Sequence, residues 1–144
     1  MIKLHDLEFE PYISEEEITK AIDTIAKRLN DEYTGRKPVF IGILNGSFMF
    51  ASEVIKRFES DCEISFVKMG SYEGTKTTGE VKTLLGLGQE LAGREVVLLE
   101  DIVDTGNTLV EVDRILTEAG VANYQVATLF FKPSAYKKDV PVQI

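Results

Sequence analysis

The sequence is poor in the residues that form disulfides and simple metal sites. Among its 144 residues there is one cysteine, Cys62, and one histidine, His5. A single cysteine excludes an intrachain disulfide, and no second histidine or cysteine lies near His5 in the sequence to complete a zinc site. We therefore expect a surface histidine and a buried, inert thiol, which is consistent with a reducing compartment.

Basic residues and long apolar runs are also scarce. The sequence contains 16 Lys and Arg residues and 24 Asp and Glu residues, so its formal net charge is −8. This balance disfavours binding to nucleic acid or to an anionic membrane through bulk charge, and an anionic substrate must be held by local donors. No apolar run is long enough to span a bilayer, and no secretory signal is evident, which predicts a cytoplasmic protein.

Three carboxylates and a turn of small residues follow a short apolar run at 96–99. The four aliphatic residues of this run are typical of a strand that is covered on both faces of a parallel sheet. Gly106 permits a close backbone approach, so the turn can aim N–H groups and hydroxyls at a phosphate. The carboxylates of Glu100, Asp101 and Asp104 would repel that phosphate, which predicts that they bind sugar hydroxyls or a metal ion, or accept a proton. The pattern therefore indicates a sugar phosphate as ligand.

The remaining patterns repeat the order of strand, polar turn and helix. Ser14 and Glu17 form a capping-box pattern, which predicts a first helix beginning at Ser14. We expect further helices at 48–58 and 109–119 and strands at 39–44, 64–69, 81–87, 96–99 and 124–131. Residues 1–13 carry several apolar side chains and are predicted to form an arm that packs onto the body. With no repeat, linker or low-complexity run, residues 1–144 are predicted to form one domain.

The residues from Glu100 to Thr108 resemble the phosphoribosyl-diphosphate (PRPP) signature of the type I phosphoribosyltransferases. The wider chain is similar to the hypoxanthine–guanine branch of that family. The resemblance implies an α/β fold with a Rossmann-like, open, mainly parallel sheet, helices on both faces and a flexible lid hairpin. It also implies a purine-salvage enzyme that transfers phosphoribosyl from PRPP to N9 of hypoxanthine or guanine, giving IMP or GMP and diphosphate.

The resemblance also gives each matched residue a role. Asp104 is expected to act as the general base at purine N7, and Lys132 to bind the exocyclic oxygen at C6, because an ammonium only donates hydrogen bonds. Glu100 and Asp101 are expected to bind the ribose hydroxyls and Mg²⁺. The other roles are the 5′-phosphate turn (Thr105, Gly106, Asn107, Thr108), a diphosphate loop with a cis peptide between Leu44 and Asn45 (Leu44, Asn45, Gly46), and the lid (Ser71, Tyr72).

The sequence departs from the family pattern in two places, and three alternative functions remain open. Members of the family often carry lysine where this chain has Asn45, and they continue beyond the position of Ile144 with a segment that covers the base, so only half a base pocket is expected here. The alternatives are a PRPP-binding regulator of the same fold, a transferase for xanthine or another base, and an inactive fragment. The family resemblance implies a homodimer or homotetramer.

Overall fold

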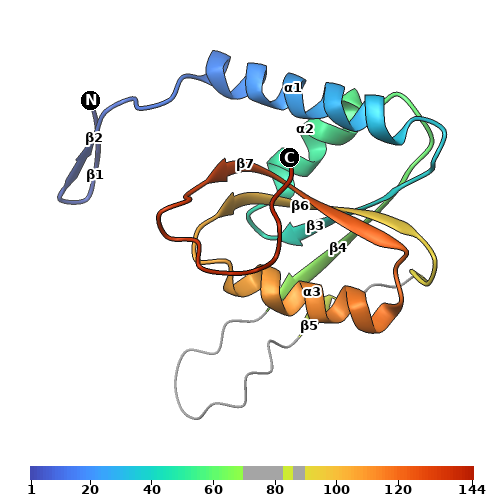
Figure 1. Cartoon of the computed structure of the whole chain (residues 1–144). Helices are drawn as coiled ribbons and strands as arrows, with labels where there is room; N and C mark the ends of the chain where they lie inside the picture. Colours follow the sequence, from blue (N-terminus) through green and yellow to red (C-terminus); the bar gives the residue numbers. More distant parts are fainter. Residues whose placement is uncertain (70–82, 86–89) are drawn as a thin grey trace, which may run out of the picture.

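The computed structural model of this chain describes residues 1–69, 83–85 and 90–144. Its centre is a five-stranded sheet with the strand order β5-β4-β3-β6-β7 (Figure 1). These strands are β3 (Val39–Leu44), β4 (Glu63–Met69), β5 (Thr83–Leu85), β6 (Glu95–Val103) and β7 (Asn123–Phe131). Neighbouring strands run parallel except β5, which pairs antiparallel with β4. The predicted mainly parallel α/β sheet is confirmed.

Helices cover both faces of the sheet, as expected. Helices α1 (Glu15–Tyr33) and α2 (Phe48–Arg57) pack on one face, and α3 (Asn107–Ala119) packs on the other. Successive residues of a strand point to opposite faces, so Phe40 faces α1 and α2 while its neighbours Val39 and Ile41 face α3. The central strands are therefore apolar along their whole buried length, which is why their sequences carry no alternation.

Helix α1 begins where the capping-box pattern predicts. The Ser14 hydroxyl oxygen accepts a hydrogen bond from the Glu17 N–H at 3.2 Å, and the Ser14 N–H donates to the Glu17 carboxylate at 2.8 Å. Both bonds satisfy N–H groups that the start of a helix would otherwise leave unpaired. None of the helices in the described ranges is both long and apolar enough to cross a membrane.

The prediction that residues 1–13 pack onto the body is wrong. They contain an antiparallel hairpin of β1 (Ile2–Leu4) and β2 (Leu7–Phe9), which stands apart from the sheet (Figure 1), and every residue of the segment is exposed. The register pairs Ile2 with Phe9 and Leu4 with Leu7, so these apolar side chains share one face of the hairpin. Apolar composition alone indicated burial, whereas the chain places that face in solvent.

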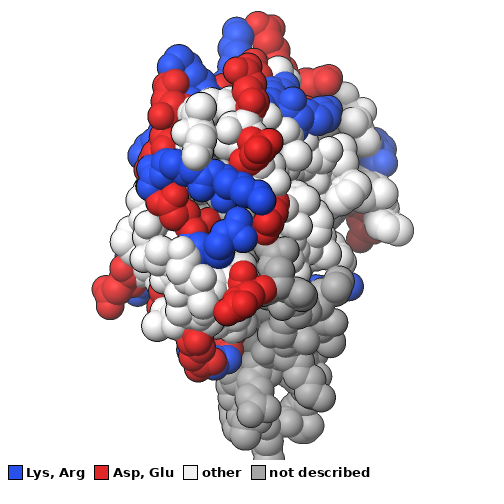
Figure 2. Space-filling model, turned by 90° about the vertical axis from the view of Figure 1, so that its right-hand side faces the viewer, with Lys and Arg blue, Asp and Glu red and all other residues white. Residues whose placement is uncertain are grey.

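Charged side chains of both signs lie close together on one face of the molecule (Figure 2). On the face shown in Figure 2, basic residues lie beside acidic ones instead of forming one basic patch. Several long-range ion pairs contribute to such mixing, namely Arg36–Glu95, Lys37–Glu63 and Arg94–Glu63. Ion pairs near the surface add little to stability.

Candidate active site

Glu100 and Asp101 lie within strand β6, which continues beyond the strand predicted at 96–99. Pairing with β3 ends at Leu99, opposite Gly42, but pairing with β7 continues as far as Val103, opposite Phe131. The ladder with β7 therefore keeps Glu100 and Asp101 in the strand beyond the point where pairing with β3 ends. The Asp101 carboxylate lies against Gly46, in the turn that follows β3.

That turn contains the predicted diphosphate loop. The peptide bond between Leu44 and Asn45 is cis, as the family resemblance implies. A Cβ atom built at Gly46 would lie 2.7 Å from both carboxylate oxygens of Asp101, so a side chain at position 46 would displace this acid. The structure thus brings two segments more than 50 residues apart in the sequence into direct contact at the carboxyl edge of the sheet.

Glu100 is the most buried of the three carboxylates, with 8% of its surface exposed. Burial raises the pKa of Glu100 to about 8, and the side-chain hydrogen bond with Asp101 and the charge of Asp101 raise it further in the same direction. At neutral pH the side chain is therefore poised to lose a proton when a cation or a hydroxyl donor approaches.

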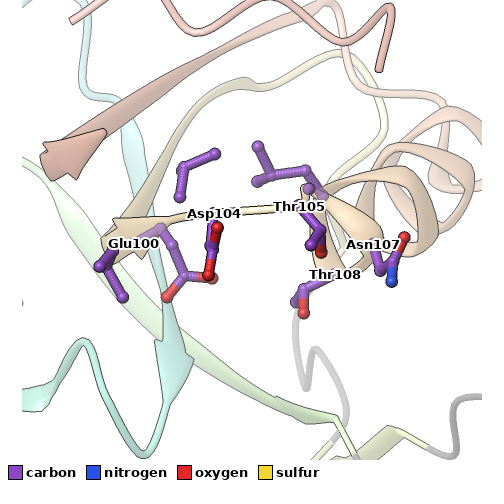
Figure 3. Close-up of a pocket in the computed structure, with 9 residues that line it drawn as sticks. Glu100, Asp104, Thr105, Asn107 and Thr108 are labelled. Carbon is purple, nitrogen blue, oxygen red and sulfur yellow. The ribbon is translucent and has the colours of Figure 1, made fainter. Parts of the chain in front are cut away.

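The predicted phosphate turn forms the wall of a small cavity (Figure 3). The cavity has a volume of about 110 Å³ and is lined by Glu100 and by residues 102–109. Gly106 adopts a left-handed conformation with φ +84°, and its carbonyl accepts the hydrogen bond of Val110 at 3.2 Å. Helix α3 begins at Asn107, so the N–H groups of its first turn have no carbonyl partner within the helix and are free to bind an anion.

Asp104 and Lys132 lie side by side at the same edge. The Lys132 N–H donates to the Val103 carbonyl at 3.0 Å, which fixes the residue after β7 against the end of β6. The Lys132 Nζ atom is 3.7 Å from the Asp104 Oδ2 atom, and the two side chains are 60% and 49% exposed. A pair this open to water is weak, so both groups remain available to a ligand.

The structure gathers most of the predicted site residues but not all of them. Ser71 and Tyr72 lie outside the described residues. Within the ranges 1–69, 83–85 and 90–144, no three His, Cys, Asp or Glu side chains come together as a possible metal site. The sequence analysis missed Tyr136, whose ring lies against Gly106. No local signal marks this residue, because the contact joins the turn to a segment 30 residues further along the chain.

The comparison with protein families agrees with this geometry. The family model described as "Phosphoribosyl transferase domain" matches residues 13–142. The chain belongs to this family, the type I phosphoribosyltransferases.

Individual relatives are named for one branch of the family. The hypoxanthine-guanine phosphoribosyltransferase of Staphylococcus aureus is 36% identical over 132 residues, which are 91% of this chain and 74% of that protein. The enzyme of the same name from Lactococcus lactis is 40% identical over 122 residues, 84% of this chain and 66% of that protein.

Solved structures extend the similarity to the fold. The crystal structure of a hypoxanthine phosphoribosyltransferase from Staphylococcus aureus matches with a TM-score of 0.83 and 35% identity, covering 90% of this chain and 71% of that one. A hypoxanthine-guanine phosphoribosyltransferase from Bacillus anthracis gives a TM-score of 0.84 at 30% identity, covering 94% and 78%. The family match over residues 13–142 contains the strands of the sheet and the site residues described above.

Proposed function

We propose that this chain transfers the phosphoribosyl group of PRPP to N9 of hypoxanthine or guanine, forming IMP or GMP and diphosphate. The observation that carries the proposal is the meeting of three strand ends at one edge. The diphosphate loop after β3, the acids and phosphate turn at the end of β6, and Lys132 after β7 all lie there. The names of the relatives support the same reaction.

Each end of PRPP has a matching group. Thr105, Gly106, Asn107 and Thr108 hold the 5′-phosphate with the backbone N–H groups and hydroxyls at the start of α3. Glu100 and Asp101 accept hydrogen bonds from the two ribose hydroxyls. Leu44, Asn45 and Gly46 bind the diphosphate through backbone atoms. The contact between Gly46 and Asp101 supports this arrangement, because it brings the loop that we assign to the diphosphate next to an acid that we assign to the ribose hydroxyls.

Mg²⁺ is the cofactor that this donor set fits. Glu100 and Asp101 provide carboxylate oxygens on consecutive residues, and Mg²⁺ is usually held by one or two carboxylates together with substrate phosphates. When bound, the ion supplies neutralisation of charge on the departing diphosphate.

The pairing of Asp104 with Lys132 suits one edge of a purine. O6 and N7 of a 6-oxopurine are neighbours on that edge. Lys132 donates to O6, and Asp104 accepts the proton of N7, so that electron density reaches N9 as it attacks the ribose. The distance of 3.7 Å between the two groups fits this spacing. Adenine carries an amino group in place of O6. An ammonium group cannot accept a hydrogen bond from that amino group, so Lys132 disfavours adenine.

The remaining parts of the proposal rest on the family resemblance. Ser71 and Tyr72 belong to a lid that excludes water from the oxocarbenium-like ribose during transfer. The chain assembles as a homodimer or homotetramer and works in the cytoplasm. Light scattering coupled to size-exclusion chromatography measures the assembly directly, and a monomeric active enzyme would contradict that part.

The test is an absorbance assay with PRPP, Mg²⁺ and each base in turn. We expect turnover with hypoxanthine or guanine and none with adenine. Lys132→Ala should raise the KM of the base by about 10-fold or more, the cost of a lost charged hydrogen bond, and change the KM of PRPP by less than twofold. Lys137→Ala, an exposed lysine of the following segment, is the matched control. PRPP binding without turnover on any base would instead indicate a regulator. Turnover with xanthine alone would indicate a transferase for that base.

A further inference from the structure

The ring of Tyr136 occupies the space where a side chain at position 106 would be. A Cβ atom built at Gly106 would lie 2.3 Å from Tyr136 Cε2 and 2.9 Å from Tyr136 Cδ2. Lys138 approaches the same position, with its Cγ atom at 2.9 Å. The segment after β7 therefore touches the backbone of the phosphate turn at its one left-handed residue.

The ring itself is held on several sides. It packs edge-to-face on Phe131, with 5.5 Å between ring centroids and 71° between planes. Its hydroxyl donates to the Val140 carbonyl at 2.5 Å. The side chain also packs on the apolar cluster that includes Val103 and Leu109, the residues that flank the turn on either side. Tyr136 is thus fixed by groups that do not belong to the turn.

The turn needs such support because its own residues do not supply it. Glycine has more backbone freedom than any other residue, so Gly106 by itself does not hold φ near +84°. A phosphate is bound tightly only if the N–H groups converge in advance, because ordering them on binding reduces affinity. A rigid ring packed against the glycine restricts that freedom before the ligand arrives.

From these contacts we infer that Tyr136 is a positioning residue for the 5′-phosphate. Its ring holds Gly106 in the phosphate-binding conformation and so sets the affinity for PRPP and for the nucleotide product. The inference rests on the proposed function, since it assigns the phosphate turn to PRPP. Tyr136 touches no substrate in this account and acts only through the backbone of the turn.

The test compares three variants at Tyr136 with a matched tyrosine. Tyr136→Ala removes the ring, Tyr136→Phe keeps the ring without its hydroxyl, and Tyr136→Leu fills part of the volume. Tyr124 is the control because it packs on the same apolar cluster and its hydroxyl donates to Asp113. Its backbone lies near the amino end of β7, whereas Tyr136 follows the carboxyl end of that strand, and no Tyr124 atom is among those closest to Gly106.

We expect Tyr136→Ala to raise the KM of PRPP and the Kd of GMP by about 10-fold, a loss typical of one well-placed packing contact. The KM of the purine base should change by less than about threefold. Tyr136→Leu should give an intermediate effect, and Tyr136→Phe should restore nearly normal PRPP binding. Tyr124→Ala should lower the melting temperature without raising the KM of PRPP. Steady-state kinetics and calorimetric titration with PRPP, Mg²⁺ and GMP measure these values.

Three results would overturn the inference. One is an unchanged PRPP affinity in both Tyr136→Ala and Tyr136→Leu. Another is an equal rise in the KM of PRPP and of the base, and the third is the same rise in Tyr124→Ala, which would reflect general loosening. If Tyr136→Ala does not fold, Tyr136→Leu and Tyr136→Phe decide the question. Failure of the wild-type protein to bind PRPP at all would instead reject the proposed function.

Discussion

Replacing Gly106 with alanine tests the phosphate turn most directly. The substitution adds a single methyl group, yet it meets two separate obstacles. The residue has φ +84°, where an L side chain is strained, and the new Cβ would lie 2.3 Å from the Tyr136 ring. We expect a loss both of stability and of PRPP binding.

The expected loss of stability is the sum of the backbone strain and the steric overlap. A left-handed backbone costs an alanine about 1–2 kcal/mol, and forcing an extra methyl into a packed contact costs about 1–3 kcal/mol. Relief of the overlap requires the turn or the ring to move by about 1 Å, and a displacement of that size can lower binding or rate about 10²-fold. The expected loss of unfolding free energy is therefore about 2–5 kcal/mol, together with a rise of about 10²-fold in the KM of PRPP.

Gly120 provides a matched control at the other end of α3. It is also left-handed, with φ +73°, but a Cβ there would meet only the Ala92 methyl at 4.0 Å, an ordinary contact. Gly120→Ala should therefore lose only the unfolding free energy that backbone strain costs, about 1–2 kcal/mol, and keep normal PRPP kinetics. Urea unfolding measures both stability losses, and initial rates measure the KM of PRPP.

Equal stability losses in Gly106→Ala and Gly120→Ala would refute the reasoning, because the overlap with Tyr136 would then carry no cost. The double variant Gly106→Ala with Tyr136→Ala sharpens the test. Removing the ring relieves the overlap, so the double variant should be more stable than the sum of the two single losses allows. Simple additivity would show that the two residues do not interact.

Two further predictions concern the carboxylates. Asp104→Asn should lower kcat by about 10²-fold or more while the Kd of PRPP stays unchanged, and normal turnover would reject Asp104 as the base. Glu100 has a pKa of about 8 in the folded protein against an ordinary value of 4.5. The folded state thus binds the Glu100 proton more tightly than the unfolded state does. The contribution of this proton to the free energy of unfolding is fully present below about pH 4.5 and is lost as pH rises through 8. Without Mg²⁺, urea unfolding should show Glu100→Gln more stable than wild type at pH 8, by on the order of 4 kcal/mol, and about equally stable at pH 4.5. A parallel pH profile for both proteins would contradict this.

The parts of the fold that the sequence predicted are those with a local cause. The capping box at Ser14 places the start of α1 within the four residues that form it. The apolar runs of β3 and β6 indicate strands covered on both faces, and the glycine-containing turn before Asn107 indicates the start of α3. Each of these features needs only a few neighbouring residues to specify it, so a single sequence carries the information.

The parts that the sequence did not predict depend on distant partners. Strand β6 continues through Glu100 and Asp101 because β7 pairs with it, and polar residues alone indicated a loop. The hairpin at residues 1–13 has an apolar face, but composition did not show that this face lies in solvent. Short-range patterns identify an element, whereas its length and burial are decided by the segments that lie beside it.

Gly106 shows how the two kinds of information combine in one residue. The sequence indicates that a glycine is needed here for its conformational freedom, and the positive φ of Gly106 agrees with that interpretation. The structure adds a second requirement, because the Tyr136 ring leaves no space for a side chain there. A residue that is free in isolation is therefore restrained by its surroundings, which is what a preorganised phosphate site requires. Under the proposed function, the local motif would determine that a phosphate is bound, and the inferred role of the distant ring would be to increase how tightly it is bound.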